Sequence, residues 1–160
     1  MSSWSEVMVA APALASTIKA RFDAYGLGLL ATIRSDGFPR ISGIEPLFAE
    51  ELWLGMMPNS RKAADLKRDP RLCLHSATSD KNVTAGDAKL FGRGVEVEDQ
   101  KALRRFQADF AAQSGSGAPP GPMHLFRVEV KEISFLSPNV DHLVIESWRQ
   151  GGKVRRVERR

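Results

Sequence analysis

Short apolar segments, separated by turn residues, recur along most of this chain. Such a pattern is typical of antiparallel strands joined by tight connections. Six or seven segments fit it, and few helical stretches interrupt them: residues 27–34, 39–48, 52–56, 71–76, 88–98, 125–136 and 143–148. This arrangement predicts a small barrel or sandwich instead of a parallel βαβ sheet. The sequence contains neither GxGxxG nor a Walker A motif, so Rossmann and P-loop nucleotide sites have no support.

Three helices are expected, one before the first strand and two between later strands. Residues 11–25 carry Leu14, Ile18 and Phe22 on one helical face, and Asp99 is placed to cap another helix. A short helix begins at Ser60 and stops before Asp69-Pro70. Residues 114–122, rich in Gly, Ser and Pro, are predicted to form a loop within the domain.

Length and composition predict one cytoplasmic domain over residues 1–160. No apolar run approaches the roughly 18 residues that cross a bilayer, and the first residues lack the basic region of a signal peptide. The single cysteine, Cys73, lies in an apolar strand and is expected to be inert. Of the net charge of +4, residues 149–160 contribute six Lys or Arg against one Glu. A chain-wide affinity for nucleic acid is therefore not indicated, although a basic C-terminal segment is.

The start of the Ser60 helix is unusual in its charge. A helix N-terminus carries a partial positive charge and free N–H groups, yet Arg61 and Lys62 follow Ser60 here. One interpretation is a bound phosphate, held by the hydroxyl, the N–H groups and both cations. The alternative is an ordinary solvated basic turn, which costs only about a few tenths of a kcal/mol.

Three segments, in this order, resemble the flavin-binding split β-barrel superfamily of pyridoxamine 5′-phosphate oxidase and its deazaflavin-using relatives. The first is the hairpin LATIRSDGFP at residues 30–39. The second is the LWLG strand at 52–55, followed by SRKA at 60–63 and DPR at 69–71. The third is the FGRGV strand at 91–95, which precedes an acidic helix start.

The resemblance implies a mainly β fold with flanking helices, an antiparallel Greek-key split barrel. It further implies a homodimer with each cofactor between subunits. Arg61 and Lys62, with Ser60, would bind the cofactor phosphate, while strand residues would lie along the ring: Ile41, Ser42, Gly43, Ile44, Gly55 and Met56. Ordinary barrel packing is the alternative role of these strand residues.

Two departures limit what the resemblance implies. Ser42 stands where the flavin oxidases carry a basic residue, with Arg40 nearby on the same strand face. Lys89 is a further candidate for contact with a flavin. Trp148 and Arg159 are similar in placement to C-terminal residues that touch flavin across the dimer, but Val157 replaces the substrate-binding His. Pyridoxamine phosphate is therefore not the expected substrate.

The expected function is an oxidoreductase that binds FMN and acts on a small substrate. One alternative keeps the fold and uses the deazaflavin F420, and another is a non-catalytic protein that binds flavin or haem. His75, His124 and His142 lack metal-ligand spacing, so no metal site is expected. No residue is assigned as catalytic, because the cofactor performs hydride transfer in such enzymes. No membrane partner is expected.

Overall fold

The computed structural model describes residues 1–117 and 121–160, so the centre of the predicted 114–122 loop lies outside the described residues. The helices are α1 (Trp4–Ala10), α2 (Pro12–Asp23), α3 (Arg61–Arg68) and α4 (Gln100–Ser114). The strands are β1 (Gly28–Ile33), β2 (Pro39–Ile44), β3 (Pro46–Phe48), β4 (Leu52–Met56), β5 (Arg71–Ser76), β6 (Asp87–Glu96), β7 (His124–Pro138), β8 (Leu143–Arg149) and β9 (Arg155–Arg159).

All named strands pair antiparallel in one sheet. The main path runs β2-β1-β5-β6-β7-β4-β3, and β8 joins β7 to β9. β2 and β3 lie at opposite ends of this path, yet only Glu45 separates them in the sequence. The sheet therefore curves until its two ends meet, as a split barrel requires. A single strand over 39–48 was wrong, because Pro46 cannot donate to a continuing ladder and the chain changes partner there.

β7 is the longest strand and carries both halves of the sheet. Its first part pairs with β4, its last part pairs with β8, and β6 runs along most of its length. The register of the β6–β7 pair shifts between Phe91 and Gly92, where the strand carries two glycines, Gly92 and Gly94. A Cβ at Gly92 would lie 2.3 Å from the carbonyl oxygen of Glu129, so only glycine fits this approach.

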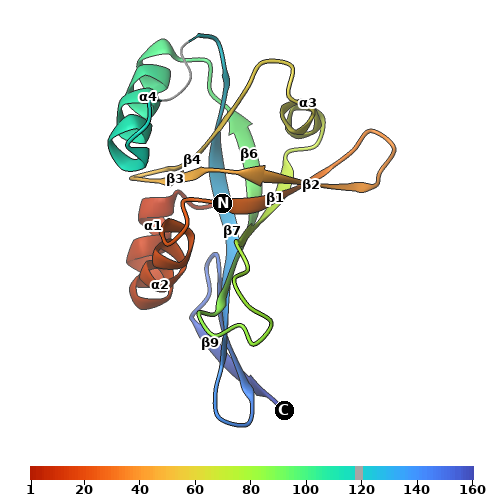
Figure 1. The fold of residues 1–160 in the computed structure, drawn as a ribbon, viewed down its shortest axis with the longest axis vertical. Coiled ribbons are helices and arrows are strands. Elements are labelled where there is room, and N and C mark those ends of the chain that lie inside the picture. Colours follow the sequence, from red (N-terminus) through yellow and green to blue (C-terminus); the bar gives the residue numbers. More distant parts are fainter. Residues whose placement is uncertain (118–120) are drawn as a thin grey trace.

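The N-terminal helical region consists of two helices where one was expected. Ser3 and Glu6 form a capping box at the start of α1, whose Trp4 and Val7 are buried. α2 keeps the predicted apolar face, and its Phe22 is buried in the same core. Figure 1 shows α1 and α2 together on one side of the sheet, with α3 on another.

The basic C-terminal segment is not a free tail. Residues 155–159 form β9, which pairs with β8 from Leu143 to Ser147 after a turn with Gly151 at φ +77°. Every residue of β9 is exposed. In Figure 1 this β8–β9 arm extends to the end of the molecule away from α3 and α4. No helix among residues 1–117 and 121–160 has the length and apolarity to cross a membrane.

Candidate functional site

A cavity of about 300 Å³ lies where β2, β4 and the start of α3 meet. We call it the α3 groove. It brings together five of the residues expected at the cofactor, Gly43, Ile44, Gly55, Met56 and Lys62, although they come from three separate elements. Sequence reasoning missed the other lining residues, which are Leu27, Glu45 and Met57.

The N-terminus of α3 opens without a side-chain cap. Ser60 occupies the N-cap position with an extended backbone, but its hydroxyl accepts no hydrogen bond from the first turn. The first N–H groups of a helix have no partner within the helix itself, so they stay available to a ligand. Arg61 is exposed beside them, and no ion pair is formed by it within the described ranges.

Lys62 extends from α3 across to β2. Its Nζ donates to the carbonyl oxygen of Gly43 at 2.8 Å. Burial lowers the pKa of the Lys62 ammonium, because the half-buried cation loses hydration. Among residues 1–117 and 121–160 no carboxylate pairs with it. The groove therefore contains a cation whose charge an anionic ligand would balance.

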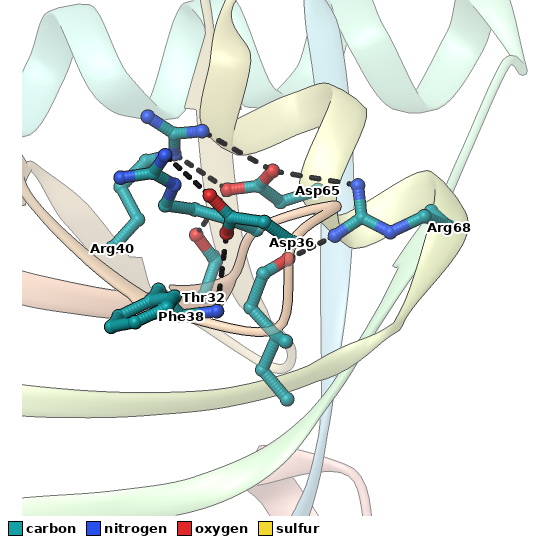
Figure 2. A network of polar contacts seen from close by, with 8 residues as sticks. Thr32, Asp36, Phe38, Arg40, Asp65 and Arg68 are labelled. Carbon is teal, nitrogen blue, oxygen red and sulfur yellow. Dashed lines mark hydrogen bonds and ion pairs between the residues drawn. The ribbon is translucent and has the colours of Figure 1, made fainter.

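A buried carboxylate fixes α3 to the first hairpin (Figure 2). Asp65, only 3% exposed, accepts hydrogen bonds from Thr32 Oγ1 at 2.8 Å and Arg40 Nε at 2.6 Å. Arg68 lies 3.7 Å from the same carboxylate and also donates to the carbonyl of Ile33. Burial acts to raise the pKa of Asp65, but the hydrogen bonds and cations outweigh it and the pKa is lowered overall.

This network explains where Arg40 lies. The hydrogen bond to Asp65 raises the pKa of the Arg40 guanidinium and fixes its Nε on α3. Arg40 is thus bound to the helix whose first turn begins the groove. Sequence reasoning missed Asp65, since an aspartate inside a short helix gives no signal of the hairpin it contacts.

The two groove glycines differ in their surroundings. A Cβ on Gly43 would meet no heavy atom within 4 Å, so this position keeps the groove floor open. A Cβ on Gly55 would lie 2.7 Å from the ring of Phe106 in α4. Packing against α4 therefore explains why residue 55 is a glycine, whereas no packing contact requires a glycine at position 43.

Ile41, Ser42 and Lys89 lie outside the groove lining. Ile41 projects from β2 and is 70% exposed, while Ser42 is half-buried and alternates with it. Lys89 lies on β6, in the row that runs from Gly43 through Leu29 and His75. Three strand spacings separate Lys89 from Gly43, roughly 14 Å.

Trp148 and Arg159 belong to the β8–β9 arm. Trp148 pairs with Ile133, is 3% exposed, and its Nε1 is buried without a hydrogen-bond partner. Because its ring is covered by the chain's own core, it presents no face to the surface. Arg159 is exposed in β9, opposite Leu143. Figure 1 shows β9 at the end of the molecule away from α3.

The arrangement supports binding of an anionic group at one end of a partly apolar groove. Lys62 lines that end beside the first turn of α3, and Met57 and Ile44 add apolar surface beyond it, while Ser60 and Arg61 lie next to the groove without lining it. No group of three or more His, Cys, Asp or Glu residues within the described parts of the chain could hold a metal ion.

A family model described as pyridoxamine 5′-phosphate oxidase matches residues 14–137. No curated protein matches the sequence. Solved structures with a similar fold include ChuZ from Campylobacter jejuni, at 15% identity and a TM-score of 0.72, covering 91% of this chain and 63% of that one. PhzG from Burkholderia lata, in complex with tetrahydrophenazine-1-carboxylic acid, has 18% identity and a TM-score of 0.60, covering 96% and 91%. An F420 reductase has 18% identity and a TM-score of 0.55, covering 68% and 88%. At these identities the likeness concerns the fold.

Proposed function

Because the chain belongs to the pyridoxamine 5′-phosphate oxidase family, we propose that it is an oxidoreductase that binds FMN in the α3 groove. The family match spans both the first hairpin and α3, which build the groove. The observation that carries the proposal is Lys62. Its ammonium is half-buried, its pKa is lowered, and it faces the groove beside an uncapped helix N-terminus. A phosphate would balance this charge.

The residues present fit the phosphate end of such a cofactor. Ser60 can donate its hydroxyl, Lys62 its ammonium and Arg61 a bidentate guanidinium, while the helix N–H groups complete the cradle. The open floor at Gly43 admits a flat ring against the β2 backbone. Packing of Gly55 on Phe106 holds β4 as the opposite wall.

The chemistry divides between cofactor and chain. A bound flavin or deazaflavin supplies hydride transfer to or from the substrate. The chain's own residues bind, orient and shield: the α3 residues fix one end, and Asp65 holds α3 against the hairpin through Thr32 and Arg40. The apolar side chains of Leu27, Ile44 and Met57 would exclude water along the groove.

The test is cofactor binding by variants of α3. Arg61→Ala and Lys62→Ala together should weaken FMN binding by about 3 kcal/mol, or roughly 100-fold, because two charge-assisted contacts are lost. Flavin absorbance after equilibrium dialysis measures the change. Lys101→Ala is the matched control, since Lys101 occupies the second position of α4 as Lys62 does in α3. Equal affinity in the double variant and the control would reject the assignment.

F420 is the second candidate cofactor, because the structure of an F420 reductase shares this fold. The absorbance of the purified protein distinguishes FMN from F420, since bound FMN absorbs at about 450 nm and F420 at about 420 nm. Turnover with NAD(P)H or reduced F420 then distinguishes an enzyme from a protein that only binds its ligand. A protein that binds neither compound would contradict both candidates.

We further propose a homodimer with the groove at its interface. Ile41, Ala31, Cys73 and Phe91 are register partners on four neighbouring strands and form one row across the outer sheet face. Ile41 is 70% exposed in this row, and Leu29 beside it is also exposed. Gly43 and Leu29 begin the next row, so a second copy on this face would border the α3 groove.

A further inference from the structure

A separate cavity, of about 250 Å³, lies between the β3–β4 turn and α4. We call it the Trp53 cavity. Figure 1 shows α4 beside this β3–β4 end of the sheet. Among the described residues, none lines both this cavity and the α3 groove. Because a water molecule takes about 30 Å³, the space admits a ligand of roughly eight non-hydrogen atoms.

The carboxylate of Glu51 lines this cavity and is left without a partner. Within residues 1–117 and 121–160, its Oε2 is buried and accepts no hydrogen bond. The nearby cation Arg127 pairs instead with Glu129 at 3.3 Å. A buried acceptor without a donor is unfavourable, and a ligand that donates a hydrogen bond to Oε2 would remove this loss.

The lining of the Trp53 cavity is acidic as a whole. Four carboxylates line it against two cations, Lys101 and Arg105. Arg105 makes only long contacts of 3.8 Å with Glu50 and Asp109. Burial raises the pKa of Glu51, and the neighbouring carboxylates add to this effect. A cationic ligand would stabilise the ionised form of Glu51 and balance the excess negative charge.

The carboxylates lie at two depths. Glu50 and Asp109 have side chains that are 81% and 45% exposed, whereas Oε2 of Glu51 is buried. A ligand that satisfies both depths needs two cationic groups held apart by a short chain.

Apolar surface is available to such a chain. The ring of Trp53 is half-buried against the α4 cluster, and Phe106, which also lines the cavity, is only 3% exposed. Methylene groups would be covered by these rings, and an ammonium group over the Trp53 face would gain a cation–π contact.

We propose that the Trp53 cavity binds a short aliphatic diamine. Glu51 binds one ammonium group beside the ring of Trp53, and Asp109 binds the other at the exposed side. The methylene chain between them lies against Phe106. This site goes beyond the proposed function, because it shares no lining residue with the α3 groove in the described parts of the chain and takes a ligand of the opposite charge.

Isothermal titration calorimetry of the full chain with four probes tests the proposal: 1,4-diaminobutane, 1-aminobutane, 1,4-butanediol and Mg²⁺. The diamine should bind at least about tenfold tighter than the monoamine, because the monoamine lacks one charge-assisted contact. Butanediol should show no measurable binding. Mg²⁺ carries the same charge without a chain, so it should bind at least about tenfold more weakly than the diamine.

Glu51→Gln should weaken binding of the diamine at least about tenfold. Thermal unfolding of the same preparations shows that the variant is folded, because loss of an unpaired buried charge should raise its stability. Glu6→Gln is the matched control. It removes a negative charge near Glu51, keeps a residue suited to the α1 capping box and does not line the cavity.

Four results would overturn the inference. They are no binding of the diamine, equal affinity for diamine and monoamine, Mg²⁺ binding as tight as that of the diamine, and equal diamine affinity in Glu51→Gln and Glu6→Gln.

Discussion

Gly43 lies exposed in β2, and its Cα faces the open floor of the α3 groove. Replacement by Val should lower the affinity for FMN about tenfold or more, because the added methyl groups occupy the space of the ring. The free energy of unfolding should change little, since no neighbouring atom is displaced. Fluorescence titration with FMN, together with urea unfolding, measures the two effects.

Gly55→Val is the comparison variant, because here the free energy of unfolding should fall. Its side chain would collide with Phe106, so this variant should lose stability by about 1–3 kcal/mol. If Gly43→Val destabilised the protein as much as Gly55→Val, an empty floor at Gly43 would be contradicted.

Glu51 is a second residue whose replacement should change the free energy of unfolding. Burial raises the pKa of its carboxyl, and the nearby Arg127 only partly offsets this, while Oε2 lacks a hydrogen-bond partner. A raised carboxyl pKa means that the folded state favours the protonated form of Glu51. The charged form therefore lowers the free energy of unfolding at neutral pH. This loss of stability disappears once the pH falls below the pKa of the unfolded state. Glu51→Gln should therefore raise the free energy of unfolding by about 1 kcal/mol at pH 7.

The gain should vanish near pH 4, about the ordinary pKa of a glutamate. Thermal unfolding across this pH range measures it, with Glu50→Gln as control because the Glu50 side chain is exposed next to it. A gain that persists unchanged at low pH would contradict the role of the Glu51 charge.

Individual residues differed in how far the sequence could place them. The cationic start of α3 is visible as local charge, so the position of Arg61 and Lys62 in the first turn of a helix could be predicted, and their contact with a phosphate stays a prediction. Asp65 and Glu45 could not, because their roles depend on elements brought together only by folding. Asp65 meets a hairpin some 30 residues earlier, and Glu45 lines the α3 groove only because the sheet closes at the β2–β3 junction.

At the level of elements, α3 is held by one buried carboxylate. Asp65→Asn removes the charge that compensates Arg40 and Arg68, and should destabilise the protein by about 3 kcal/mol in urea unfolding. Because the folded pKa of Asp65 is lowered, its contribution is present at neutral pH and lost as the pH falls through that pKa. The variant should accordingly show a weaker loss of stability in acid.

Asp36→Asn is the control, since Asp36 pairs with Arg34 at the exposed hairpin turn. Comparable destabilisation in the two variants would show that α3 does not depend on the buried network.

Elements with strong local signals were predicted well, and those decided by pairing were not. The β1–β2 turn at Gly37, the Asp99 cap and the strand over 71–76 agree with expectation. α1 was missed although Ser3 and Glu6 carry a capping signature, because seven residues show little periodicity. β9 was missed because its basic side chains suggest a solvated segment, and its pairing with β8 leaves no local signal in the sequence.

At the level of the whole molecule, the exposed row on the outer sheet face predicts self-association. Ile41→Glu places a charge at the β2 end of that row, where the side chain is most exposed, and should convert the proposed dimer to a monomer, measured by sedimentation equilibrium at micromolar concentration. FMN affinity should fall with it, since the groove borders the same face. Val140→Glu is the control at a fully exposed turn position. A monomeric unmodified protein would contradict the dimer.

The division of one strand at Glu45 also affects the order in which the sheet can assemble. β3 pairs only with β4 in the described sheet, and β4 finds its other neighbour in β7, which begins at His124. During synthesis the β3–β4 hairpin therefore leaves the ribosome before β7 does. Until β7 follows, the free edge of β4 has no partner strand. Unpaired edges invite contacts between chains. The late arrival of β7 thus sets the interval in which a nascent chain is most exposed to aggregation.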